Sequence, residues 1–434
     1  MINHDLAQAL RARIAWIAAD GRAVPPAFVD AAKAACYAIV APPQRADIAV
    51  VDLYGADPGA AAALDAVAAA RRLATGAGLV IAADASLSTE ERRRLARLGE
   101  AVFLRASVEP LIGAVRERLR LANLADETGD RLKSLVADGH AVGFSPSPPK
   151  PQGEVLVAGK PSPVALAAMN ALRAGRRTPV SVFTAGQAMR ALDHGAFDGA
   201  VFIPSDENDL LIALARALRR HRDHRRLPVI ILSRDEDLLD RRAAKDGLEA
   251  MAADRAGDDL ARRLETMTRR AGMSAAMRAF LRSAQGSGGA GGASSPRLFA
   301  LHATCVGRRA DETERTLSFV ALSLTPRSGR SAPARAVLEE ALRTTARLVR
   351  AEDMIARLTT STIVVMLRAT RGADAERVAR RLEGVVTGVQ PRATLDLFNV
   401  ASAAVERAPG TELERVIAAL IAEMRQRRNT AARA

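Results

Sequence analysis

The sequence is poor in cysteine and in aromatic residues, and each shortage excludes a class of protein. The 434 residues include two cysteines, Cys36 and Cys305, without CxxC spacing, which argues against a disulfide framework and a structural zinc site. Aromatic residues make up 3% of the chain, so the base-stacking platforms of single-strand binders are almost absent. No apolar run approaches the roughly 20 residues that span a bilayer, and the first residues lack a signal-peptide pattern. We expect a cytoplasmic protein without membrane insertion.

Positive charge, by contrast, is in excess and comes almost entirely from arginine. Lys and Arg total 63 against 49 Asp and Glu, a net charge of +14, and 58 of the 63 basic residues are arginine. This balance favours an anionic partner, such as a nucleotide, phosphate, nucleic acid or acidic protein. A GC-rich coding bias would also enrich arginine together with the abundant alanine. Nucleic acid is therefore the least favoured of these partners.

Two stretches of unusual composition divide the chain. Residues 144–153 (FSPSPPKPQG) are rich in proline, and residues 285–296 (QGSGGAGGASSP) form a flexible Gly/Ser linker. A chain of this length is expected to form two to four domains, at roughly 100 to 200 residues each. The predicted organisation is a first domain at 1–125, a connecting segment at 126–153, a second domain at 154–284, the linker at 285–296 and a third domain at 297–434.

Apolar runs alternate with helical periodicity in the first two domains, which is typical of a doubly wound parallel sheet. Strands are predicted in the first domain at 13–18, 47–53, 78–82 and 101–104, with helices at 59–74 and 88–98. The second domain repeats the scheme, with strands at 154–159, 178–183, 198–203 and 228–233 and helices at 162–174, 185–194, 207–222 and 258–283. The fold class is therefore α/β, with an internal repeat.

The third domain has a different pattern, in which a strand hairpin lies between helices. Strands are predicted at 317–324, 354–358, 362–368 and 396–405, and helices at 332–349, 373–386 and from 411 onward. A hairpin inside such a layout indicates an α+β domain with helices on the faces of the sheet.

The first two domains resemble the receiver domains of two-component response regulators. In that family, an Asp at the end of the third strand accepts a phosphoryl group beside a bound metal ion. Asp52, in the run DIAVVDL, matches the acceptor, but Ala18 and Ala19 stand where the metal-binding acids are expected. In the second domain, Ile203 occupies the acceptor position. The resemblance implies two degenerate receivers, with Asp52 as a candidate phosphoacceptor and no metal expected.

The third domain resembles a GGDEF domain, the fold that makes cyclic di-GMP from two GTP. The run RAEDMIARLTTSTIVVML, which begins at Arg350, lies over the family's Arg-x-x-Asp, its five-residue spacer and its signature hairpin. Residues 359–363 (TTSTI) replace the signature, and Ser323 and Thr325 replace the metal-binding Asp-x-Asp. The family needs the glycines for close approach of the phosphates and the acids for metal. We therefore expect a GGDEF-like domain that is not an enzyme.

The Arg-x-x-Asp motif itself is retained, and in this family it forms the inhibitory site, which binds the product. Arg350 and Asp353 keep its spacing, and Arg381, with its neighbour Arg380, stands where a second arginine assists from the following helix. Guanidinium groups pair with phosphates or guanine, and a carboxylate accepts from guanine N–H groups. A plain ion pair between Arg350 and Asp353 is the alternative. The offset from the signature, together with a net charge of +8 from residue 297 onward, favours a cyclic di-GMP site.

The order of two receivers and a GGDEF domain resembles the PleD-type response regulators, and the erased signature resembles their PopA-type relatives. This resemblance implies a non-enzymatic cyclic di-GMP receptor that forms a homodimer. It also implies an adaptor role on proteins of signalling and regulated proteolysis in the cell cycle, with recruitment to a cell pole. Two alternatives stay open: a ligand-independent interaction scaffold, and a residual phospho-signalling protein acting through Asp52.

Overall fold

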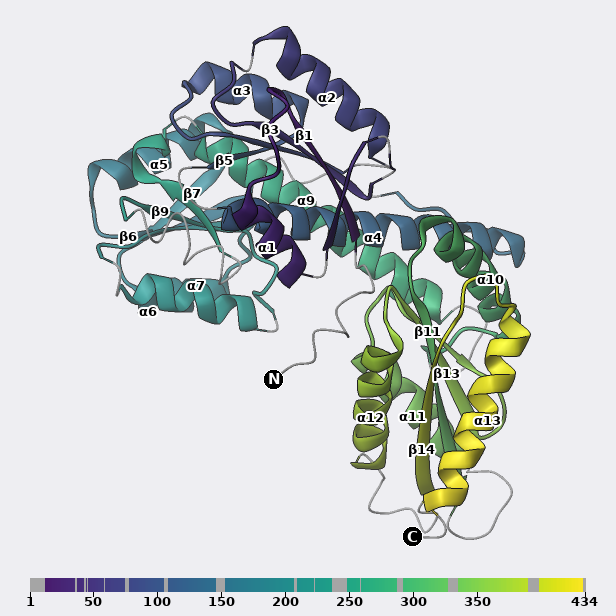
Figure 1. Ribbon diagram of the computed structural model, residues 1–434. Coiled ribbons are helices and arrows are strands. Elements are labelled where there is room, and N and C mark those ends of the chain that lie inside the picture. The colour runs from purple at the N-terminus through teal and green to yellow at the C-terminus, as the bar shows by residue number, and fades with distance from the viewer. Residues whose placement is uncertain are drawn as a thin grey trace. The chain divides into compact units, whose positions relative to one another are not determined.

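The structure is a computed structural model in which the chain forms two compact units (Figure 1). The N-terminal unit contains residues 12–122 and 146–275, and the C-terminal unit contains residues 123–145 and 276–434. The residues that the structure describes are 12–35, 37–42, 44, 46–57, 59–74, 78–104, 108–145, 153–206, 209–221, 223–235, 248–257, 259–286, 292–326, 335–388 and 398–431.

The first sheet of the N-terminal unit is entirely parallel, with strand order β2-β1-β3-β4-β5. This is the flavodoxin-like order of doubly wound folds. Helices α1 and α4 cover one face of the sheet, and α2 and α3 cover the other. The elements are β1 (Ala12–Ala18), α1 (Pro26–Ala34), β2 (Tyr37–Val40), β3 (Ile48–Leu53), α2 (Ala61–Leu73), β4 (Leu79–Asp84), α3 (Thr89–Leu98), β5 (Glu100–Leu104) and α4 (Glu109–Ala137).

The second sheet has the same topology, since its order β10-β9-β8-β6-β7 is the same pattern in reverse. Helices α6 and α7 pack on one face, and α5 and α9 on the other. The elements are β6 (Glu154–Gly159), α5 (Pro163–Ala174), β7 (Thr178–Val182), α6 (Ala185–His194), β8 (Gly199–Ile203), α7 (Leu210–Arg220), β9 (Val229–Ser233), β10 (Glu249–Ala252), the 3-10 helix η3 (Ala253–Arg255) and α9 (Leu260–Gln285).

The C-terminal unit contains an antiparallel sheet of order β12-β13-β11-β14, and apolar clusters fill both of its faces. Helices α10 and α13 pack on one face with the ends of α4 and α9, and α11 and α12 pack on the other. The elements are α10 (Pro296–Thr313), β11 (Leu317–Pro326), α11 (Arg335–Leu348), β12 (Met354–Arg357), β13 (Thr362–Arg368), α12 (Gly372–Gly388), β14 (Phe398–Glu406) and α13 (Leu413–Ala431).

The predicted α/β class is confirmed, because two parallel sheets with helices on both faces occupy the N-terminal unit. The bounds of the two units differ from the domain bounds predicted from the sequence. Residues 126–137, expected in a connecting segment, complete helix α4 and belong to the C-terminal unit. The proline-rich residues 146–152 and residues 287–291 of the predicted linker lie outside the described part of the chain.

Candidate functional site

The Arg350–Asp353 motif forms a tight turn between α11 and β12. One carboxylate oxygen of Asp353, Oδ2, accepts a hydrogen bond from the backbone N–H of Arg350 at 3.0 Å. The backbone N–H of Asp353 donates in return to the carbonyl oxygen of Arg350 at 3.2 Å. The Arg350 side chain is exposed. The motif is therefore a self-closed turn that presents one guanidinium group on the surface.

The Asp353 carboxyl group is buried, with 4% of the residue exposed. Its second oxygen, Oδ1, has no hydrogen-bond partner among the residues that the structure describes. Burial raises the pKa of Asp353 to about 7, although the charge of Arg350 acts in the opposite direction. With its side-chain amide oriented to satisfy both contacts, Gln285 at the end of α9 donates to the Asp353 carbonyl oxygen at 3.2 Å and accepts from the Ile355 N–H at 3.1 Å. The side chain of Gln285 thus fixes the backbone of the turn.

The structure brings Arg381 beside this turn. Arg381 lies on α12, and its Nη2 atom donates to the carbonyl oxygen of Leu348 at 3.0 Å, two residues before Arg350. Arg380 follows another direction, because adjacent helical positions point about 100° apart. Its side chain is 70% exposed, and its Nη2 atom lies 3.8 Å from Glu376 on the same helix. Of the two predicted assisting arginines, Arg381 is the one that reaches the Arg350 turn.

Of the residues predicted to replace the GGDEF signature, 359–361 form the turn between β12 and β13, and 362 and 363 begin β13. The Leu358 N–H donates to the carbonyl oxygen of Thr362 at 2.9 Å, and Ser323 on β11 pairs in register with Thr362. Ile363 is fully buried. These positions offer hydroxyl and aliphatic side chains, which supply no carboxylate for a metal ion. Within the described ranges, no group of three or more His, Cys, Asp or Glu residues is placed to hold one.

Asp52 lies near the end of β3, next to Ala18 and Ala82 in the neighbouring strands. Its carboxylate is 3% exposed and lies 3.1 Å from Nε of Arg22, and it also accepts from the Tyr54 N–H at 3.0 Å. Burial raises the pKa of Asp52, while the Tyr54 amide and the Arg22 guanidinium oppose the rise. A side-chain cation therefore already pairs with the candidate phosphoacceptor.

In the second sheet, the position that corresponds to Asp52 is occupied by Ile203, which cannot accept a phosphoryl group. Ile203 ends β8 with 8% of its surface exposed, and a Cβ atom built on Gly159 would lie 2.7 Å from the carbonyl oxygen of Ile203. The backbones approach too closely there for an acidic side chain at position 159. Ser233 at the end of β9 is buried, and its Oγ accepts from the Asp235 N–H at 3.0 Å.

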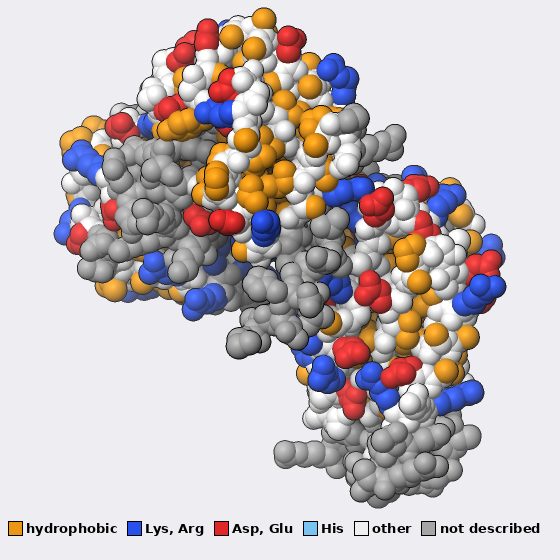
Figure 2. All heavy atoms as spheres, in the orientation of Figure 1, with side chains coloured by type: hydrophobic (Ala, Val, Ile, Leu, Met, Phe, Trp, Pro, Cys, Tyr) orange, Lys and Arg blue, Asp and Glu red, His pale blue; other side chains and the backbone are white. Residues whose placement is uncertain are grey.

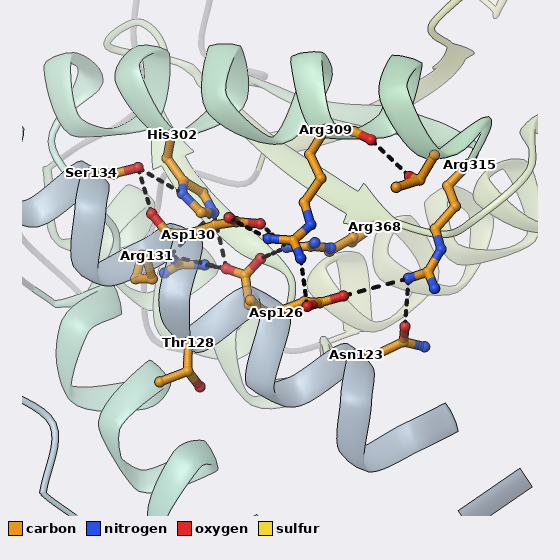
Figure 3. A network of polar contacts seen from close by, with 12 residues as sticks. Asn123, Asp126, Thr128, Asp130, Arg131, Ser134, His302, Arg309, Arg315 and Arg368 are labelled. Carbon is orange, nitrogen blue, oxygen red and sulfur yellow. Dashed lines mark hydrogen bonds and ion pairs between the residues drawn. The ribbon is translucent and has the colours of Figure 1, made fainter. Parts of the chain in front are cut away.

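A buried ionic network in the C-terminal unit was not foreseen from the sequence (Figure 3). Glu127 on α4 is fully buried and accepts hydrogen bonds from Arg131 at 2.6 Å, His302 at 2.9 Å and Arg368 at 2.6 Å. Arg368, the last residue of β13, also lies 3.0 Å from Asp130. The network therefore joins α4, α10 and the hairpin strand β13.

The charges within this network control its protonation. Burial acts to raise the pKa of Glu127, but His302, Arg131 and Arg368 outweigh it and hold the pKa below the usual range. Burial lowers the pKa of His302, and the neighbouring charge of Glu127 opposes this shift. The only local signal in the sequence is the i,i+4 spacing of Glu127 and Arg131. Their other partners lie more than 170 residues away.

No protein-family profile and no curated protein matches the chain. Solved structures similar to it are GGDEF domains. The GGDEF domain of DgcB from Caulobacter crescentus, solved with c-di-GMP, is 16% identical over 32% of this chain and 84% of its own, with a TM-score of 0.28. A sensory box/GGDEF protein from the same organism is 16% identical over 31% and 93%, with a TM-score of 0.28. The GGDEF domain of YfiN from Pseudomonas aeruginosa is 20% identical over 31% and 91%, with a TM-score of 0.27. At these TM-scores, the likeness assigns neither a family nor an activity.

Proposed function

We propose that this chain is a non-enzymatic receptor for cyclic di-GMP, built on a degenerate GGDEF domain. The observation that carries the proposal is the hydrogen bond from Arg381 on α12 to the carbonyl oxygen of Leu348, which brings one exposed arginine to the segment that presents Arg350. Guanidinium groups can bind phosphate oxygens in a fork and stack on guanine. The dinucleotide offers both groups.

Asp353 has a different role in this proposal from the one that the motif suggested. Its Oδ2 atom holds the backbone of Arg350, so the carboxyl group first shapes the turn that presents the arginine. Its Oδ1 atom is buried, so in this proposal the carboxyl group shapes the site and does not contact the ligand. Arg380 contributes long-range positive charge to the ligand.

The absence of catalysis in this proposal follows from the hairpin residues. Phosphoryl transfer depends on metal ions that neutralise the developing charge. Thr359, Thr360, Ser361 and Thr362 in the turn, and Ser323 beside it, provide hydroxyl groups in place of carboxylates.

The two parallel-sheet domains act in this proposal as receivers that have become interaction modules, for homodimerisation and for partner proteins in signalling and regulated proteolysis. The pairing of Arg22 with Asp52 supports this role, because it already satisfies the carboxylate that a phosphoryl group would occupy. For the same reason, phospho-signalling through Asp52 is the weaker alternative.

Calorimetric titration of the full chain with cyclic di-GMP tests the proposal. We expect a micromolar or tighter Kd, weakened at least about tenfold in Arg350→Ala and in Arg381→Ala, because a hydrogen bond to a charged group contributes roughly 1.5–3 kcal/mol. Arg343→Ala is the matched control, since this exposed arginine lies on α11 and pairs with Glu340. Absence of heat at high ligand would leave the scaffold alternative, and equal affinity in all three variants would show that the ligand does not bind at the Arg350 turn. Formation of cyclic di-GMP from GTP would contradict the non-enzymatic part.

A further inference from the structure

A second candidate binding site lies within the N-terminal unit. A cavity of about 720 Å³ opens between β5 and α4 of the first sheet domain and β10 and α9 of the second. Ligand pockets for small organic molecules occupy roughly 300–1,000 Å³. The size therefore suits a molecule as large as a nucleotide.

The lining of this cavity is strongly basic. Ten arginines and five acidic residues line it, an excess of five positive charges around one cavity. Arg116 and Arg120 lie one turn apart on α4, so they share a helix face. Arg262 and Arg269 lie two turns apart on α9 in the same manner. The two helices thus each direct a row of guanidinium groups toward the cavity.

Ion pairs within the wall leave part of this charge uncompensated. The carboxylate of Glu100 is buried, and three arginines surround it: Arg118 at 2.8 Å, Arg263 at 3.6 Å, and Arg270, which donates to it. Glu249 pairs with Arg263 through two hydrogen bonds of 2.7 and 2.8 Å. Arg118 and Arg270 therefore share a single carboxylate.

Four further arginines on the rim of the cavity have no carboxylate partner within the described residues: Arg97, Arg116, Arg120 and Arg269. Their side chains are exposed, so they can turn toward a ligand without breaking an existing ion pair. Like charges gathered in this way repel one another, and a bound anion relieves that repulsion. A guest with several negative charges close together matches the arrangement.

Part of the wall is apolar, including Val102, Leu248, Met251 and Met267. Methionine adapts its shape to flat organic groups and makes favourable contacts with aromatic rings. Such a surface is suited to a nucleobase, whereas an inorganic anion has no apolar group that could pack against it.

We propose that this cavity binds a nucleotide with two or more phosphates. The phosphates contact the arginine rows of α4 and α9 around Glu100, and the base lies against the methionines. Cyclic di-GMP fits less well, because its two phosphates carry one charge each and stand apart. This site shares no residue with the Arg350 turn, so the proposal can be tested independently of the function proposed above.

Titration of the Arg350→Ala chain with ATP, GTP, pyrophosphate and cyclic di-GMP tests this site without a contribution from the other one. We expect ATP or GTP to bind more tightly than pyrophosphate and cyclic di-GMP. Adding Arg116→Gln and Arg120→Gln should weaken the nucleotide at least about tenfold, as expected for two lost charge-assisted bonds. Arg72→Gln, an exposed arginine on α2 outside the cavity, is the matched control and should leave the affinity unchanged.

A second variant should raise the affinity for the nucleotide, whereas the first variant lowers it. Glu100→Gln removes the carboxylate that Arg118 and Arg270 share, so a folded variant should bind the nucleotide several-fold more tightly. Circular dichroism checks that Glu100→Gln folds. The test with Arg116→Gln/Arg120→Gln does not depend on this variant. No heat at millimolar nucleotide, or binding that the α4 double variant leaves intact, would overturn the proposal. So would a preference for pyrophosphate over both nucleotides.

Discussion

Asp353 is a carboxyl group whose surroundings oppose its ionisation. It is buried in the Arg350 turn, close enough to Glu352 and Glu127 for their charges to raise its pKa further, and only Arg350 offsets them. Because its pKa rises from 3.8 unfolded to about 7 folded, the folded state binds the proton more tightly than the unfolded chain does. The stabilisation is complete below about pH 4 and is lost as the pH rises through about 7.

We predict that Asp353→Asn removes this pH dependence. The asparagine oxygen can still accept from the Arg350 N–H, but the side chain cannot ionise. Each pKa unit corresponds to about 1.4 kcal/mol, so the variant should be more stable than the parent at pH 8 by up to roughly 4 kcal/mol. Urea unfolding at pH 4 to 8 measures the difference. Glu352→Gln, in the same turn, is the control, and a parent curve that stays flat over this range would refute the assignment.

At the level of single residues, Arg22 compensates the negative charge of the buried Asp52. Its guanidinium group lies 3.1 Å from the carboxylate. Asp20, 3.4 Å from Arg22, adds a second, exposed carboxylate to the cluster. One guanidinium group is thus shared between two carboxylates at the end of β3.

Among the elements, the second half of α4 depends on charge for its packing as well as on apolar contacts. Leu135 enters the core beside α10, and Glu127 and Asp130 lie opposite Arg368 on β13. Removal of one partner from a buried ion pair leaves an uncompensated charge, which is much more costly than the loss of an exposed pair. Helix α4 therefore has a single favoured register on this sheet.

We expect Glu127→Gln to lower the free energy of unfolding by about 3–5 kcal/mol, because Arg131 would lose its buried carboxylate and Arg368 would lose one of its two. Asp126→Asn is the matched control on the same helix. Asp126 is partly exposed and pairs with Arg309, so its loss should change stability by about 0–1 kcal/mol. Denaturant unfolding compares the two variants. Equal effects would show that the network contributes no more than a surface pair.

Helix α10 was not predicted from the sequence, although its first residues carry the local signals of a helix start. Ser295 caps it by accepting from the Leu298 N–H, and Pro296 occupies its first turn, a typical helix start. The same Ser-Pro pair at the end of a glycine-rich run was assigned to the linker. The extension of α4 to Ala137, in contrast, has no such marker, because its stability comes from partners far along the chain.

At the scale of the whole molecule, the positive charge does not form one continuous surface on the visible side of the C-terminal unit. Figure 2 shows basic and acidic side chains interspersed there. Nucleic-acid binders usually carry a basic stripe or face. Among the described residues, no helix is long and apolar enough to cross a membrane.

Two compact units should unfold in two separable transitions. We predict that cyclic di-GMP raises only the transition of the unit that contains Arg350. At a ligand concentration 100 times the Kd, binding adds about 2.7 kcal/mol, which corresponds to a shift of several degrees for a unit of this size. Differential scanning calorimetry with and without the ligand measures both midpoints. One cooperative transition, or an equal shift of both, would contradict this division.

The sequence alone determined the α/β class, the repeated strand pattern and the positions of the hairpin and the Arg-x-x-Asp motif, because periodicity and spacing are local properties. Only the tertiary structure decided that Asp353 faces inward, that Arg381 rather than Arg380 meets the Arg350 turn, and that Arg22 pairs with Asp52. It also revealed Glu127 at the centre of a buried network. Burial and long-range pairing depend on residues brought together from distant parts of the chain, and no local pattern records them.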